Sequence, residues 1–452
     1  MIEIIVISLL VILIVAYYNL GRNISRPTIL YIGGFLICSC VALCWKDEWG
    51  LDKMSSLTAF IIIGGALTFF CVELWDYKKH EHLFTKIKSN IINEDIEPIS
   101  NKKLLLFFFF QLFVYVMFVA AKKKYVGTDS LSEALVEINN EKKFERTLIQ
   151  LPYYIVNLYF ICMTAYQLWS ILLPYYLFNS KKNNSQKMLL ALNFVTTFIG
   201  TLLSGGRTDM LYGLISFFTF SYINYQYRRG WKGGLFPRKI MISILSVGFI
   251  FILFFAEIGY IIGRKATDTT EATSMLFAIY CGAEIKNLDD YIQKPYRQGN
   301  EAGLFAQYTL CGMYDRLIER TGAEKEEVKR FSPDLSFNRH GAYPLGNVYT
   351  TYYNFILDFG YIGAILCTGI MAFIASFFYR KVVTSKFWHN GRLDLWMLFF
   401  ASYMPAACFL SFFSNKFFES FTINKTIKQL IVWWILIIIF QGRNKVRSIN
   451  KQ

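Results

Sequence analysis

The chain has 452 residues and a formal net charge of +15, and its composition excludes an ordinary soluble domain. Hydrophobic residues make up 54% of the chain and aromatic residues 18%, whereas charged residues reach only 17%. Soluble domains carry roughly a quarter charged residues, so too few charges remain here to cover a water-facing surface. The composition therefore predicts a membrane protein.

Apolar runs long enough to span a bilayer recur from one end of the chain to the other. We expect an all-α polytopic membrane protein, a single integral domain over residues 1–452 with about eleven transmembrane helices. The first run has no basic leader and is expected to be a retained helix rather than a signal peptide. The predicted spans are Ile2–Leu20, Thr28–Trp45, Leu57–Tyr77, Leu104–Ala121, Ile149–Phe178, Met188–Ser204, Met210–Tyr225, Ile240–Ile262, Asn347–Tyr379, Leu393–Phe413 and Thr426–Gln441.

Lysine and arginine residues gather in alternate loops between these runs, and such loops mark the cytoplasmic side of a membrane. They fall on one side if the N-terminus is outside and the C-terminus is cytoplasmic. The run Lys122-Lys123-Lys124 is the exception, because it falls on the outer side. The basic loops contain Arg22 and Arg26, Lys78 to Lys103, Lys181 to Lys187, Arg228 to Lys239, Arg380 to Arg392, and Arg443 to Arg447.

This topology places three informative segments on the outer face: the turn Ser204–Asp209, the loop Gly263–Gly346 and the loop Ser414–Ser420. A loop as long as 263–346 is usually functional. It has helical patterning of its own over Glu271–Gln293 and Ala302–Arg320, which suits a lid or a surface of the outer leaflet. We therefore expect a large external loop that contains short helices.

Three arginines on this face, Arg207, Arg264 and Arg339, are candidates for phosphate binding, because arginine offers fixed donors and a permanent charge. The two glycines before Arg207 allow close approach of a ligand. The alternative is that these side chains reach the lipid headgroups, which interfacial arginines commonly do. Lys416, in the last outer loop, is a further basic candidate.

Hydrogen-bonding and aromatic residues alternate where the long loop re-enters the membrane. Asn347, Tyr349 and Tyr352 are candidates for substrate binding, since tyrosine rings stack against apolar faces of sugars. The alternative is an aromatic belt at the membrane interface. Asp358 lies further along the same run, where a charge needs a partner or a wet cavity. We expect it to pair with Arg207 or Lys416, and a purely structural ion pair is the alternative.

The nine cysteines and four histidines show no metal-ligand spacing, so neither a metal site nor a cofactor is expected. Cys281 and Cys311 share the large outer loop, where oxidation is chemically possible. We favour the alternative that they are two small buried residues.

Three stretches together resemble the O-antigen polymerase, or oligosaccharide repeat-unit polymerase, family of bacterial polysaccharide systems. They are Ser204–Thr208, the stretch from Tyr280 to Tyr291, and Asn347–Thr350 followed by Asp358–Gly363. The similarity in size and number of spans covers nearly the whole chain. The motifs cover residues 204–363.

The resemblance implies a metal-independent membrane glycosyltransferase of the bacterial cytoplasmic membrane. Such enzymes polymerise undecaprenyl-pyrophosphate-linked oligosaccharide units into O-antigen or capsule at the outer face. The implied partners are this substrate, membrane lipid, and a chain-length regulator and flippase of the same pathway, without nucleic acid. Arginines would stabilise the pyrophosphate leaving group. The general base stays open among Asp358, His340, Asp209 and Glu419.

Two other functions remain open at this stage: a flippase or other transporter of the same lipid-linked sugars, and an O-antigen ligase. Transporters typically contain inverted repeats and polar groups near the membrane midplane. Here the polar residues gather at one face, and Glu257 within Ile240–Ile262 is the exception that favours a transporter.

The one-sided distribution of basic loops gives a prediction about topology. Reporter fusions after Lys103, Arg330 and Gln452 should report a cytoplasmic, an external and a cytoplasmic location. An external C-terminus would place every candidate residue on the wrong side.

Overall fold

The computed structural model describes residues 1–84, 99–140, 151–179, 184–204, 208–242, 246, 273–294, 304–314, 337–385, 395–419 and 423–441. Among these residues, seven helices are long and apolar enough to cross a membrane, so the chain is a multi-pass membrane protein. They are α1 (Ile2–Asn19), α2 (Pro27–Cys44), α3 (Ser56–Lys79), α5 (Asn101–Val126), α7 (Tyr153–Asn179), α8 (Asn184–Leu203) and α14 (Thr351–Val383).

The other four predicted spans have different outcomes. Two of them, 393–413 and 426–441, correspond to shorter apolar helices, α16 (Leu395–Phe409) and α18 (Ile423–Gln441). The predicted span 210–225 lies in α9 (Thr208–Arg228), a helix whose polar residues keep it outside the group of seven. Most of the predicted span 240–262 lies outside the described residues.

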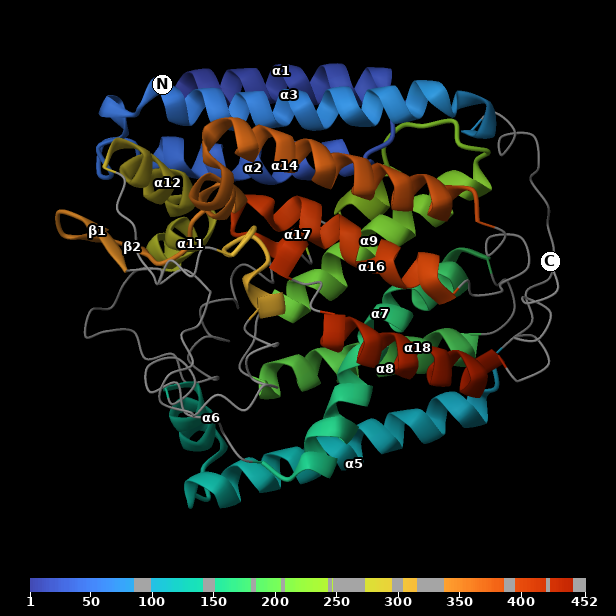
Figure 1. The fold of residues 1–452 in the computed structure, drawn as a ribbon. Coiled ribbons are helices and arrows are strands. Elements are labelled where there is room, and N and C mark those ends of the chain that lie inside the picture. The colour runs from blue at the N-terminus through green and yellow to red at the C-terminus, as the bar shows by residue number, and fades with distance from the viewer. Residues whose placement is uncertain are drawn as a thin grey trace.

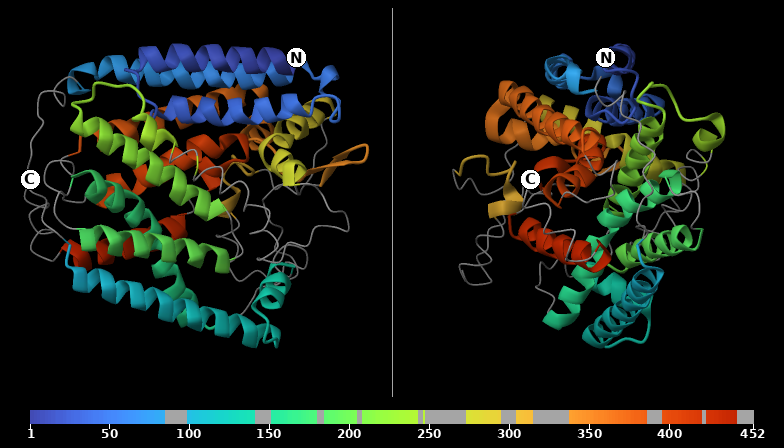
Figure 2. Two further views of the ribbon diagram at one scale, coloured as in Figure 1. Left: turned by 180° about the vertical axis from the view of Figure 1, so that it is seen from behind. Right: turned by 90° about the vertical axis from the view of Figure 1, so that its right-hand side faces the viewer.

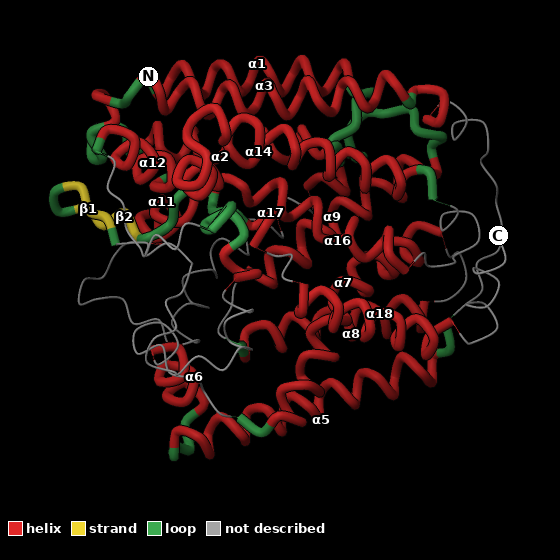
Figure 3. Tube along the Cα trace, in the orientation of Figure 1, coloured by secondary structure: helices red, strands yellow, loops and turns green. Residues whose placement is uncertain are grey.

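Within the long loop, the described part contains two short helices and a hairpin. The predicted helical stretch 271–293 is divided into α11 (Thr273–Cys281) and α12 (Ala283–Gln293). The division falls at Gly282, where an added side chain would meet Val41 Cγ1 at 2.8 Å, so the break allows close contact with α2. Strands β1 (Asn338–His340) and β2 (Tyr343–Gly346) form an antiparallel hairpin that was not predicted. It is the one yellow feature in Figure 3.

The long helices run roughly side by side, and the two ends of the bundle differ (Figure 1). The N-terminus, α11, α12 and the hairpin lie at one end, which we call the hairpin end. Helices α3, α9 and α14 all run from the hairpin end toward the opposite end, as the views from behind and from the side also show (Figure 2). The smaller elements are η1 (Leu51–Lys53), α6 (Leu131–Asn140), η3 (Leu410–Phe412) and α17 (Lys416–Glu419).

Two groups of helices share one apolar core. Helix α3 packs along α14, and α1 packs on α2 and α3, while α7 contacts α8 and α9, and α5 contacts α8. Helix α16 joins the two groups, because it contacts α2, α14, α9 and α18. The faces of α1 and α5 that point away from this core keep large apolar side chains exposed, as expected for helices in contact with lipid.

At the opposite end, buried charges connect the helices. Glu73 of α3 accepts a hydrogen bond from the backbone N–H of Thr28 at 2.7 Å, and its carboxylate lies 3.6 Å from Arg26. Asp76, one turn further, lies 3.2 Å from Nε of Arg380 on α14. Removing one member of such a buried pair typically costs about 3–5 kcal/mol. These contacts fix the helices where the basic loops gather.

Two neighbouring glycines in α2 have different surroundings: Gly34 is closely packed, and Gly33 faces open space. An added Cβ at Gly34 would lie 2.1 Å from the backbone carbonyl oxygen of Phe409, whereas at Gly33 it would meet nothing within 4 Å. Small residues let helices approach in this way within membranes.

We predict that Gly34→Ala lowers the thermal stability of the purified protein, because overpacking of this kind costs about 1–3 kcal/mol. Gly33→Ala is the matched control, and it should leave stability unchanged or slightly raised, since alanine is the better helix former. Unfolding curves in detergent would measure both. Equal curves for the two variants would show that α2 and α16 do not meet at Gly34.

Candidate functional site

The hairpin end is organised around α12, which is fixed to α3 by one carboxylate. Oδ1 of Asp289 accepts hydrogen bonds from Ser55 N at 2.9 Å and from Thr58 Oγ1 at 2.7 Å. Its Oδ2 accepts from Gln293 Nε2 at 2.7 Å. The carboxylate of Asp289 therefore lies against the N-terminal end of α3, where unpaired N–H groups and the helix dipole favour a negative charge.

Asn287, on the same helix, holds the chain between the hairpin and α14. Its Nδ2 donates to the carbonyl oxygens of Leu345 at 3.0 Å and Val348 at 2.8 Å. Its Oδ1 accepts from Nδ2 of Asn338 in β1 at 3.0 Å. Irregular backbone inside a membrane protein needs such partners, because lipid supplies none.

The span predicted from Asn347 becomes helical only at Thr351, and α14 is then broken at Gly360, with φ 68° and ψ −170°. The break separates a first segment of nine residues, 351–359, from the long helix that follows. Every residue from Thr351 to Ile356 is buried. The first segment is therefore inside the protein rather than on its surface.

Polar side chains of this first segment bind a turn that we call the strap, residues 304–314. Asp358 accepts backbone N–H bonds from Tyr308 at 3.0 Å and Thr309 at 2.5 Å. Asn354 donates to the Tyr308 carbonyl at 2.8 Å, and Asn415 donates to the Thr309 carbonyl at 2.9 Å. Three side chains thus satisfy the main chain of two adjacent residues.

Several polar atoms in these segments are inaccessible to solvent and have no hydrogen-bond partner among the described residues. They are Thr309 Oγ1, Thr350 Oγ1, Thr351 Oγ1, Ser414 Oγ and Asn415 Oδ1. Buried polar atoms are nearly always paired in native proteins, and an unpaired one costs about 1–3 kcal/mol. Their concentration in three connected segments marks a place where water or a ligand would supply the missing bonds. We call the strap, the first segment of α14 with Thr350 before it, and residues 414–419 the junction.

Helix α9 contacts the junction through Tyr212. The hydroxyl of Tyr212 donates to the backbone carbonyl of Lys416 at 3.2 Å. Asp209, one turn earlier in α9, is close enough to interact electrostatically with the hydroxyls of Tyr159, Tyr166 and Tyr403. The carboxylate of Asp209 is therefore within electrostatic range of three tyrosine hydroxyls, one of which, that of Tyr159, donates to the Gly200 carbonyl at 2.6 Å.

Four of the sequence-predicted residues belong to this region: Asp209, Asp358, Lys416 and Glu419. The expected pairing of Asp358 with Lys416 is not found. Lys416 Nζ lies 3.0 Å from Glu419, three residues along the same short helix, where side chains are neighbours. Asp358 is instead satisfied by backbone N–H groups of the strap.

The tyrosine candidates are buried rather than presented at a surface. Tyr349 is 2% exposed and stacks on Tyr353, with ring centres 4.5 Å apart. Tyr352 is fully buried, and its hydroxyl lies 2.5 Å from that of Tyr31 in α2. Asn347 is half-buried in the extended segment between them and the hairpin.

The hairpin candidates lie elsewhere. Arg339 is exposed on β1, and the ring of His340 lies against Gly50 in the α2–α3 connection. Arg207 and Arg264 lie outside the described residues, as does Glu257. Cys281 and Cys311 are not joined to each other: both are free thiols.

Sequence reasoning missed Asn354, Asn415 and the buried threonines. One signal was present: Thr350, Asn354 and Asp358 are spaced four residues apart, which places polar side chains along one face of a helix in an otherwise apolar run.

Lys122, which the sequence placed in an outer loop, is part of α5. Its side chain is 2% exposed and donates to the carbonyl oxygen of Leu203 at 2.5 Å. This lysine caps the end of α8 and is not a free loop charge.

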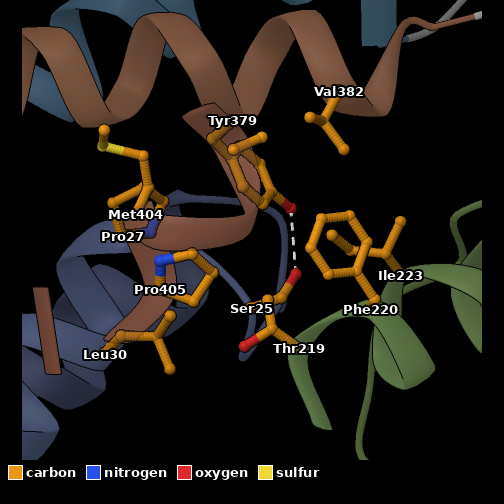
Figure 4. A pocket seen from close by; sticks show the side chains of 11 residues that line it. Ser25, Pro27, Leu30, Thr219, Phe220, Ile223, Tyr379, Val382, Met404 and Pro405 are labelled. Carbon is orange, nitrogen blue, oxygen red and sulfur yellow. Dashed lines mark hydrogen bonds between the residues drawn. The ribbon is translucent and has the colours of Figure 1, made fainter. Parts of the chain in front are cut away.

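A small apolar cavity lies at the opposite end of the bundle (Figure 4). It is lined by α2, α9, α14 and α16, with Ser25 and Tyr379 sharing a hydrogen bond of 3.1 Å at its edge. Tyr379 follows Gly360 by nineteen residues, about 28 Å along a helix, so this cavity is separate from the junction. Among the described residues, no group of three histidine, cysteine or acidic side chains could hold a metal ion.

No family model, curated protein or solved structure matches this chain.

We predict that Asp358→Ala releases the strap, because the N–H groups of Tyr308 and Thr309 lose both acceptors. Hydrogen–deuterium exchange of residues 304–314 should become faster, while exchange in α3 stays unchanged. Asp52→Asn is the matched control, since Asp52 pairs with Lys46 at an exposed site. Unchanged protection of 304–314 in Asp358→Ala would contradict an anchoring role.

Proposed function

We propose that this protein polymerises lipid-linked oligosaccharide repeat units at the outer face of a bacterial cytoplasmic membrane. The observation that carries the proposal is the junction: unpaired, buried polar atoms and acidic and basic candidates gather at one end of an apolar bundle. Polar groups at such a position are costly unless they are paired or face a wet cavity, so unpaired ones are candidates for function. The resemblance of residues 204–363 to repeat-unit polymerases supplies the reaction.

In the proposed reaction, a sugar hydroxyl of one carrier-linked unit attacks the anomeric carbon of a chain on a second carrier. The bond from that carbon to the phosphate oxygen breaks, and undecaprenyl pyrophosphate leaves with the bonding electrons. The hydroxyl proton passes to a base. The reaction consumes no nucleotide sugar, and arginine and lysine side chains can stabilise the leaving pyrophosphate in place of a cation.

The residue roles follow from the chemistry that each step requires. We assign pyrophosphate binding to Arg207, with Arg264, Arg339 and Lys416 as further basic groups. We assign sugar contacts to Asn347, because Tyr349 and Tyr352 are buried against other tyrosine rings. For the base we favour Asp209 over Asp358, because both oxygens of Asp358 already accept bonds from the strap. Glu419, paired with Lys416, and His340, packed on Gly50, are less suitable.

We predict that purified protein, given carrier-linked repeat units alone in the presence of a chelator, extends chains. Product length on gels would measure the reaction. A strict requirement for a nucleotide sugar or a divalent metal would contradict the proposal.

Deletion of the gene should leave single repeat units that are still exported. Loss of a flippase would instead trap the units inside the cell, and loss of a ligase would accumulate long carrier-linked polymer.

Variants of Arg207 test the assignment of pyrophosphate binding in the same assay. Arg207→Ala should lower the rate by one to two orders of magnitude, the equivalent of about 1.5–3 kcal/mol for a charged hydrogen bond. Arg207→Lys should restore only part of the lost rate, because lysine cannot form the bidentate hydrogen bonds that arginine makes. Arg229→Ala, an exposed arginine at the end of α9 that pairs with the Tyr225 hydroxyl, is the control and should polymerise normally.

A further inference from the structure

A second unusual feature of the hairpin end is Glu284, in the first turn of α12. Its side chain is fully buried. One carboxyl oxygen, Oε2, lies 3.7 Å from the thiol sulfur of Cys38 in α2, and the other has no hydrogen-bond partner among the described residues. None of the roles proposed above uses this carboxyl group.

Within the part of the chain that the structure describes, the groups around Glu284 offer it no positive charge. Cys38 faces it from α2 and Cys281 from α11, and both are thiols. On α12 itself, Lys286 is paired with Asp290 at 2.8 Å, and Asp289 is bound to α3. On β2, Tyr343 faces Trp45, with ring centres 6.3 Å apart. The charged residues of α3 lie in its last two turns, at the opposite end of the bundle.

Burial without a compensating charge raises the pKa of the Glu284 carboxyl well above its usual range. The docked helix therefore holds a proton at pH values where an exposed glutamate has lost it. An ionised carboxylate in this position would lose its hydration, and the backbone at the start of α12 and the Cys38 thiol would replace it only in part, so the ionised form is unfavourable. Loss of the Glu284 proton therefore destabilises the docked position of α12 on α2.

Helix α12 connects this carboxyl to the chain between the hairpin and α14 and to the start of α3. Three residues after Glu284, Asn287 binds the Leu345 and Val348 carbonyls, and Asp289 binds the first turn of α3. A movement of α12 away from α2 would break these bonds together. We propose that Glu284 is a proton-binding site that locks α12 onto α2, so that loss of its proton to solvent releases α12 and the chain between the hairpin and α14.

The sign of the effect follows from the raised pKa. Docking is complete below the ordinary glutamate pKa of about 4.3 and weakens as pH rises through the higher value of the docked state. Glu284→Gln, which keeps the shape of the protonated group without titrating, should remain docked at all pH values.

Cys38 is a natural reporter of this movement, because it is fully buried beneath Glu284. The other eight cysteines would be replaced in the full-length chain, and a membrane-impermeant maleimide would be reacted with Cys38 across a pH series. We expect labelling with Glu284 present to rise at least about tenfold more with pH than in Glu284→Gln. Dividing the two rates at each pH removes the intrinsic reactivity of the thiol.

Asp290→Asn, on the same helix but half-exposed, is the matched control and should keep the pH response. In the unmodified chain, hydrogen exchange of α12, corrected for its intrinsic pH dependence, should accelerate selectively relative to α5. Equal labelling profiles for Glu284 and Glu284→Gln, or no selective loss of α12 protection, would overturn the proposal. These measurements need no substrate, so they stand apart from the proposed polymerase reaction.

Discussion

The hydrogen bonds of Asn287 decide how the hairpin end is built. The chain must pass from an exposed hairpin into a buried helical segment, and along this path the backbone is extended, with carbonyl groups that no helix satisfies. One side-chain amide binds two of these carbonyls, Leu345 and Val348, and its oxygen also binds β1. Two further contacts to α12 support this arrangement: Asn338 of β1 donates to Asp290 at 3.0 Å, and the ring of Tyr291 packs against Tyr353 of α14.

The polar groups at the two ends of the bundle have different roles. At the opposite end the buried charges are paired: Arg26 with Glu73, and Arg380 with Asp76. At the hairpin end, several polar atoms have no partner among the described residues. The opposite end is not free of such atoms, because Arg26 Nε and Glu73 Oε1 also lack a hydrogen-bond partner among the described residues. The hairpin end differs because five of these atoms lie together in the junction, beside acidic and basic candidate residues, and this is why we place function there.

The sequence was a good guide to what depends on local composition. Apolar runs predicted the seven long helices because the requirement to span lipid is a property of each segment alone. The sequence was a poor guide to contacts between distant segments. Nothing in the run around Asp358 indicates that its partners are the backbone N–H groups of residues 308 and 309, fifty residues earlier. The short strands of the hairpin were missed because three or four residues carry too little pattern.

For the candidate site, the contacts of several residues differ from those expected from the sequence, and the differences have physical causes. Lys416 pairs with Glu419 rather than with Asp358, because neighbours on one helical turn meet without any tertiary constraint. Tyr352 was predicted to be a ligand contact at the membrane interface, yet its ring fills space beside Gly65, where an added Cβ would lie 1.9 Å from its hydroxyl. An aromatic residue near a polar one has the same sequence pattern in either setting.

Gly360 shows a restriction of a different kind. Its backbone angles belong to a region that is essentially closed to residues with a side chain of natural configuration. A Cβ built there would nevertheless meet no atom within 4 Å. The position is therefore constrained by handedness and not by volume, because these angles suit the mirror-image configuration and disfavour L-alanine even where there is room for it. A map of packing alone would rate this glycine as freely replaceable, although the turn between the two segments of α14 depends on it.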